Sequence, residues 1–126
     1  MKVKLVDKRL PMSLYEIIKF QINNYCFLNN VRISPAQLDT LAYLGMWGEM
    51  NISDFCDQIV EEEVFSNPQT VRNFVIKCVR DNLILRKGRG KKIICLGENI
   101  ELISEGSMLL NMKVYYNADQ SKESNK

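Results

Sequence analysis

The amino-acid sequence predicts an α+β, mainly helical domain, and two observations indicate this class. The first is a capped amphipathic segment over residues 67–81, and the second is a pair of short β-prone runs at residues 83–85 and 93–96. A basic turn, Lys87-Gly88-Arg89-Gly90-Lys91, separates the two runs. Turn residues between two apolar runs are typical of a β-hairpin. The sequence therefore predicts a helix followed directly by a hairpin with a cationic tip.

The helix over residues 67–81 has a well-marked start and two unlike faces. Asn67 suits the N-cap and Pro68 the first helical position. One face is apolar at the i, i+3, i+4, i+7 and i+8 spacing of a buried stripe: Val71, Phe74, Val75, Cys78 and Val79. The opposite row holds Gln69, Asn73, Ile76 and Arg80, with Arg72 and Lys77 beside it. We expect the apolar face to pack and this row to remain available for a partner.

Several elements precede this helix. Ser34 and Gln37 form a capping-box pattern that opens a helix over residues 34–47. Residues 50–52 suggest a minimal strand, and Ser53 is the expected N-cap of a helix that runs to about Val64. Upstream, a short strand at residues 2–6 and a helix through about residue 28 are expected. The default role of that first helix is packing, through the stripe Leu14, Ile17, Ile18, Ile22 and Tyr25.

The expected organisation is a single domain over residues 1–116, with a core unit at 34–96 and an N-terminal strand and helix at 2–28. A last helix is expected over residues 107–116, and residues 117–126 have the composition of a polar tail. The last helix is apolar on more than one side, which suits deep packing or an oligomer interface. The expected interface residues are Ile76, Leu109, Leu110, Met112 and Tyr115.

Charge is unevenly distributed along the chain of 126 residues, whose formal net charge is +2. Residues 72–92 hold eight basic residues and one acidic residue, a net charge of +7, whereas the rest of the chain carries −5. A basic block on a helix and an adjoining turn is typical of a surface that meets phosphates. Glu61-Glu62-Glu63 lies just before this block and would repel a nearby phosphate.

Composition argues against several other classes of protein. No apolar run reaches the roughly 20 residues of a membrane span, and residues 1–8 lack the apolar core of a signal peptide, so we expect a soluble, cytoplasmic protein without a membrane partner. The chain contains no histidine and no C-x-x-C pair. Its four cysteines, Cys26, Cys56, Cys78 and Cys95, are expected to be buried thiols. We therefore expect no enzyme activity, no metal, no cofactor and no small-molecule substrate.

The order of helix 34–47, short strand, helix 53–64, helix 67–81 and hairpin 83–96 resembles the winged helix-turn-helix fold. The stretch Ser66-Asn67-Pro68-Gln69-Thr70-Val71-Arg72-Asn73 is similar to the start of the recognition helix in regulators of the multiple-antibiotic-resistance-regulator type. In that family this helix enters the major groove of double-stranded DNA, and the wing lies over the backbone or minor groove. The resemblance implies base contacts from Gln69, Thr70 and Asn73. It implies phosphate contacts from Arg72, Lys77, Arg89, Lys91 and Lys92, and Arg80 and Lys87 are further expected DNA-binding residues.

The whole chain also resembles small winged-helix proteins of crAss-like bacteriophages. That resemblance implies a structural role in a virion, in a head-to-tail connector or portal-proximal ring, where the same surfaces pack against protein subunits. Two hypotheses therefore follow from the sequence. A DNA-binding regulator would form a homodimer through the first and last helices, whereas a virion component would form a ring or a contact with other phage structural proteins.

Overall fold

The computed structural model describes residues 12–103 of the chain, and this part is α+β and mostly helical, as predicted. The elements in chain order are α1 (Leu14–Leu28), α2 (Pro35–Trp47), β1 (Met50–Asn51), α3 (Ile52–Glu61), α4 (Pro68–Arg80), β2 (Ile84–Lys87), the 3₁₀ turn η1 (Arg89–Lys91) and β3 (Ile93–Leu96). The expected strand 2–6, the helix 107–116 with Leu109, Leu110, Met112 and Tyr115, and the tail 117–126 lie outside the described residues.

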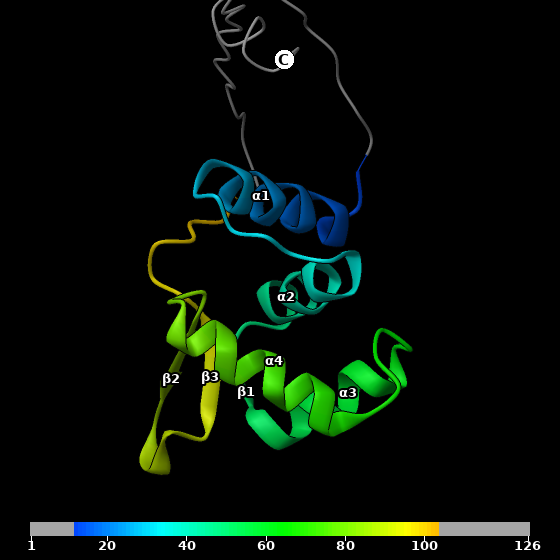
Figure 1. The fold of residues 1–126 in the computed structure, drawn as a ribbon, viewed down its shortest axis with the longest axis vertical. Helices are drawn as coiled ribbons and strands as arrows, with labels where there is room; N and C mark the ends of the chain where they lie inside the picture. Colours follow the sequence, from blue (N-terminus) through cyan, green and yellow to red (C-terminus); the bar gives the residue numbers. More distant parts are fainter. Residues whose placement is uncertain (1–11, 104–126) are drawn as a thin grey trace, which may run out of the picture.

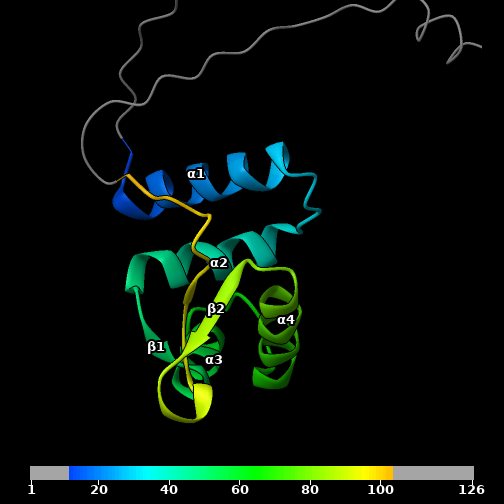
Figure 2. The same cartoon turned by 90° about the vertical axis from the view of Figure 1, so that its left-hand side faces the viewer.

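The sheet has three antiparallel strands in the order β1-β3-β2, so β3 is central. Met50 pairs with Ile94 on one side of β3, and Arg86 pairs with Ile94 on the other. Helix α1 lies over α2 at one end of the domain, and α3, α4 and the sheet lie on the opposite side of α2 (Figures 1 and 2). The tip of the β2–β3 hairpin is consequently at the end of the molecule remote from α1.

One apolar core joins the four helices found within residues 12–103 and the sheet. The inward face of α4 is buried as its spacing predicts, and α3 contributes Phe55 and Ile59 opposite it. Leu41 and Leu44 of α2 and Ile94 of β3 are also fully buried in this core. Together these contacts fix α4 in the domain with its polar row outward.

Two of the predicted helix starts are confirmed and one is wrong. The Ser34 capping box is complete, because its hydroxyl accepts from Gln37 N and the Gln37 side chain accepts from Ser34 N. Asn67 caps α4 through Gln69 N at 2.7 Å. The cap of α3, however, is Asn51 and not Ser53, because Asn51 Oδ1 accepts from Ser53 N at 2.9 Å. Asn51 therefore ends β1 and caps α3 at once.

Three helices end in the same Schellman geometry without a glycine. The residues in the left-handed conformation are Asn30 after α1, Glu63 after α3 and Asn82 after α4, with φ values of 57°, 61° and 62°. After α3, Glu63 N donates to Val60 O and Val64 N donates to Ile59 O, which closes the helix end. The expected end of this helix near Val64 is therefore wrong, since α3 stops at Glu61.

The hairpin differs from its prediction by a shift of its first strand. β2 covers Ile84–Lys87 and not residues 83–85, so Lys87 belongs to a strand and not to the turn. The backbone of Gly88, Gly90 and Lys91 has positive φ values of 81°, 70° and 52°. Arg86 Nε donates to Lys91 O at 2.9 Å across the turn. These features close the hairpin tip as a compact basic turn.

A tyrosine, a lysine and an aspartate attach α1 to α2. Tyr15 donates to Asp39 Oδ1 at 2.5 Å, and Lys19 forms an ion pair with the same oxygen at 2.7 Å. Burial of Asp39 would raise the pKa of its carboxyl, but the hydrogen bonds from Lys19 and Tyr15 outweigh it and lower that pKa. The Tyr15 ring also packs on Tyr43, with ring centroids 4.7 Å apart. These contacts hold the first helix against the rest of the domain.

Gln21 fixes the chain that follows β3. This glutamine is buried in α1, where its Nε2 donates to Ile103 O at 2.8 Å and its Oε1 accepts from Ile103 N at 2.7 Å. The side-chain amide thus satisfies both polar groups of one backbone residue, as a neighbouring strand would. Ile103, the last described residue, is held beside α1 by this pair.

Replacing Gly97 with alanine is expected to destabilise the fold by about 3 kcal/mol, because a methyl group has no room there. A Cβ at Gly97 would lie 2.2 Å from the Asn82 carbonyl oxygen, which is backbone. The control is Gly90→Ala, since Gly90 has φ 70° and ψ 8° and a Cβ there would meet only the Lys92 side chain, at 3.6 Å. That variant should lose about 1 kcal/mol from backbone strain alone. Urea denaturation measures both losses, and equal losses would contradict the close approach at Gly97.

Replacing Glu63 with glycine is expected to stabilise the fold by about 1 kcal/mol. In the left-handed conformation the Cβ of glutamate lies too close to the following carbonyl oxygen, and glycine has no Cβ. Glu61→Gly is a matched control that removes the same charge from the last residue of α3. It should lose about 0.5 kcal/mol, since glycine within a helix is unfavourable. Thermal unfolding of the two variants should shift in opposite directions, and a shared direction would show that charge dominates.

Candidate functional site

The exposed row of α4 is the first part of the candidate site. Gln69, Asn73, Ile76 and Arg80 are all exposed, as are Thr70 and Lys77 beside them. Asn67 and Pro68 start the helix, and burial of the opposite face sets its rotation. The row therefore presents two amides, one apolar side chain and a basic end along a single helix face.

Two hydrogen bonds organise the beginning of this row. Gln69 Nε2 donates to Asn73 Oδ1 at 2.9 Å, which ties the two amides together one turn apart. Arg72 is half-buried, and its Nη2 donates to Ser53 Oγ of α3 at 2.9 Å. The guanidinium of Arg72 thus lies toward α3, on the flank of the row.

The second part of the candidate site is the hairpin tip. Arg89, Lys91 and Lys92 are exposed there, and Lys92 O accepts from Ile52 N at 2.8 Å, so the tip is joined to the start of α3. Lys87 differs from these three residues because it forms an ion pair with Glu49. The hydrogen bond to the Glu49 carboxylate raises the pKa of Lys87. Part of the predicted cationic surface is therefore paired within the protein.

Helix α4 and the hairpin both extend to the end of the domain remote from α1, with the start of α4 beside α3 and the hairpin tip across from it in Figure 1. In Figures 1 and 2, the beginning of α4 and the hairpin tip both point toward the end of the molecule remote from α1. The structure thus brings the first turns of α4, with Gln69, Thr70 and Asn73, to the same end as the basic tip. Lys77 and Arg80 lie in the last turn of α4, farther from this end.

The three glutamates before α4 are exposed, and two of them have partners within the protein. Glu61 Oε2 accepts from Gln58 Nε2 at 3.1 Å, and Glu62 Oε2 accepts from the Tyr43 hydroxyl at 3.5 Å. Glu63 occupies the left-handed position after α3. Glu62 therefore faces α2.

A second surface, the outer face of α1, was not predicted from the sequence. Leu14 was expected in the packing stripe but is exposed, and so are Phe20, Phe27 and Leu28, the last two with exposed fractions of 79% and 75%. An open hollow of about 710 Å³ adjoins the end of this face, lined by Cys26, Phe27, Leu28, Asn30, Val31 and Arg32. The sequence of α1 contains more apolar residues than one buried face can hold, which was a sign that some of them would be exposed. Which of them are exposed is decided by the packing of α1 against α2.

The cysteines show little sign of reactive chemistry. Cys26, Cys56 and Cys78 are buried free thiols, as expected, and Cys95 is half-buried. Burial raises the pKa of the Cys78 thiol to about 12 and also raises the pKa values of Cys26 and Cys56. A thiol with a raised pKa carries little of the thiolate that acts as a nucleophile.

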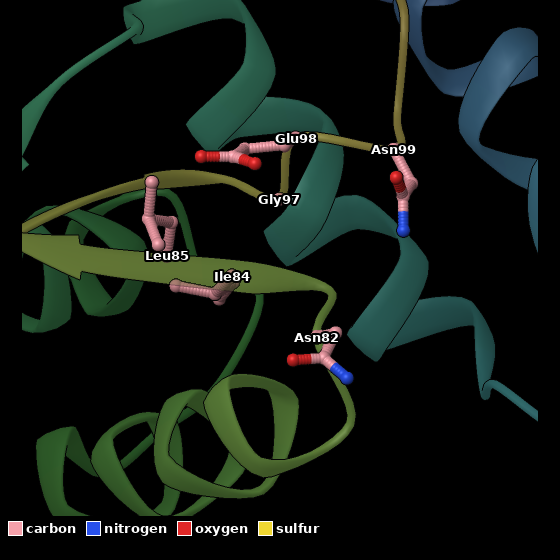
Figure 3. Close-up of a pocket in the computed structure, with 6 residues that line it drawn as sticks. All are labelled: Asn82, Ile84, Leu85, Gly97, Glu98 and Asn99. Atoms are coloured by element: carbon pink, nitrogen blue, oxygen red, sulfur yellow. The ribbon is translucent and has the colours of Figure 1, made fainter.

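A small pocket opens where β2 starts and the chain turns after β3. It is lined by Asn82, Ile84, Leu85, Gly97, Glu98 and Asn99, and Figure 3 shows these residues coming from the two segments. Its volume of about 180 Å³ is below the roughly 300 to 1,000 Å³ of typical small-molecule sites. Within residues 12–103, no three cysteine or carboxylate side chains gather where they would hold a metal ion. No helix in this range has the length and apolar character needed to cross a bilayer.

Comparisons with protein-family models, with curated proteins and with solved structures found no match to this chain. A function is therefore inferred from its own side chains. Two surfaces are distinctive: the polar row of α4 with the basic hairpin tip, and the apolar outer face of α1.

Proposed function

We propose that the chain is a non-enzymatic winged-helix module that binds double-stranded DNA. In this proposal α4 enters the major groove and the β2–β3 hairpin acts as the wing on the phosphate backbone. The order α2, β1, α3, α4, β2, β3 is compatible with the winged helix-turn-helix arrangement. The observation that carries the proposal is that the first turns of α4 and the basic hairpin tip lie at the same end of the domain (Figure 2).

The chemistry of the two parts divides the expected contacts. Amides such as Gln69 and Asn73 bind adenine edges, whereas exposed cations bind phosphates. Because Lys87 is paired with Glu49 and Arg72 with Ser53, the wing contacts are assigned to Arg89, Lys91 and Lys92. Lys77 and Arg80 are exposed at the other end of α4 and are assigned to the backbone along the groove.

A second candidate function is a structural module, such as a subunit of a bacteriophage virion ring. The specific observation in its favour is the outer face of α1, with Leu14, Phe20, Phe27 and Leu28 exposed. Phe27 and Leu28 are the most exposed of these residues and are adjacent at the end of α1, beside the hollow, and exposed apolar patches mark protein interfaces. In this role the face packs against a neighbouring subunit, and the hollow beside Phe27 receives part of that neighbour.

Replacing Arg89, Lys91 and Lys92 together with alanine is expected to flatten the salt dependence of binding to a random DNA duplex. The slope of log K against log salt should fall in magnitude by about 2.7, because each phosphate contact contributes about 0.9. Fluorescence anisotropy between roughly 50 and 200 mM salt measures this slope. Arg32→Ala is the control, since Arg32 is an exposed arginine in the loop between α1 and α2. An unchanged slope in the triple variant would remove the hairpin from the interface.

Replacing Phe27 with aspartate is expected to abolish assembly if the outer face of α1 is a subunit interface, because the contact would bury an unpaired charge. Ser66→Asp places the same charge on an exposed position between α3 and α4, on the opposite side of α2 from α1, and should leave assembly unchanged. Sedimentation velocity gives the mass of each species. A wild-type monomer at all concentrations, or normal assembly of the Phe27 variant, would count against this candidate.

A further inference from the structure

Ile76 is the apolar residue of the α4 row. Unlike the amides and the arginine of that row, it can neither hydrogen-bond to a base nor pair with a phosphate. Its side chain is 48% exposed, and it lies in the same row as Gln69 and Asn73. With a rise of 1.5 Å per residue, Gln69 and Ile76 are about 10 Å apart along the helix, close to three base-pair steps of DNA. A helix lying along the groove would therefore present the two amides and Ile76 to successive base pairs.

Each of these side chains matches one half of an A·T pair. Adenine offers N7 and the N6 amino group to an amide, and thymine adds a 5-methyl group that packs against apolar side chains. The hydrogen bond between Gln69 and Asn73 uses one donor and one acceptor. Gln69 Oε1 and the Asn73 amino group therefore keep hydrogen-bonding capacity for a base.

The commonest reader of guanine is an arginine that binds O6 and N7 together. Arg72 is the arginine nearest the two amides in sequence, but its Nη2 donates to Ser53 Oγ at 2.9 Å. Its guanidinium is thus engaged toward α3 and not along the row. Arg80, the other arginine of α4, lies one turn beyond Ile76 at the end of the row, so the two amides have no free arginine beside them.

We propose that the α4 row selects A·T base pairs, with Gln69 and Asn73 on adenine and Ile76 against the thymine methyl group. This inference rests on the proposed DNA-binding function and specifies which base pairs it favours. Ile76 is then a specificity-determining residue, because its exposed side chain contacts a methyl group that only thymine carries.

The test compares three duplexes of equal length at fixed low salt: one rich in A·T pairs, the same sequence with uracil in place of thymine, and one rich in G·C pairs. Uracil lacks only the 5-methyl group, so the second duplex isolates the contact with Ile76. The wild-type protein should bind the thymine duplex about fourfold more tightly for each methyl group that it buries. It should bind the G·C duplex most weakly.

Ile76→Ser should bind the thymine and uracil duplexes equally while still preferring both over G·C. Ile103→Ser is the matched control, because Ile103 is an isoleucine of similar exposure, 46%, that lies beside α1. It should keep the discrimination of the wild type. Ile76→Val retains a branched apolar side chain, so it should preserve part of the discrimination and show that folding is intact.

The outcomes separate the inference from the function on which it rests. Binding of all three duplexes with equal affinity would overturn the A·T assignment. Discrimination between the thymine and uracil duplexes that survives Ile76→Ser would overturn the contact between Ile76 and the methyl group. Either result would leave DNA binding standing. No binding to any duplex would overturn both.

Discussion

Burial of the apolar face of α4 is the constraint on which the rest of the structure depends. Val71, Val75 and Cys78 are almost completely inaccessible, and they pack in the same core as Phe55 and Ile94. Because a helix is rigid, burying this face also sets the direction of every side chain on the opposite face. The exposed row is therefore a consequence of the core, and a change in core packing would turn the row as well.

Local chemistry predicted the parts of the fold that neighbouring residues decide. Asn67-Pro68 and the Ser34 box start their helices where the sequence indicated, because each cap contacts backbone only two or three residues away. Ser53 was chosen as a cap on the same grounds and is not one. Its hydroxyl accepts from Arg72, 19 residues later in the chain, while Asn51 provides the cap. The Asn51 cap is as local as the other two, but the bond from Arg72 to Ser53 and the pairing of Asn51 with Ile93 are tertiary contacts that no local pattern contains.

In the candidate site too, local spacing predicted some features and tertiary contacts decided others. Helical spacing was sufficient to place Gln69, Asn73 and Ile76 in one exposed row. It could not show that Lys87 pairs with Glu49, because the two residues are 38 positions apart. In α1 the spacing placed Ile18 and Ile22 in the packing stripe correctly, but it did not show that Leu14 lies outside that stripe. Phe27 and Leu28 remain outside because the packing of α1 uses Ile18, Ile22 and Cys26.

The hydrogen bonds between Gln21 and Ile103 have a practical consequence for binding measurements on immobilised protein. Because both backbone groups of Ile103 are held by α1, the described chain finishes at the end of the domain opposite the hairpin tip (Figure 1). A linker that begins beyond this residue starts from the α1 end. A protein immobilised in that way would present α4 and the hairpin to the solution, while α1 would face the support.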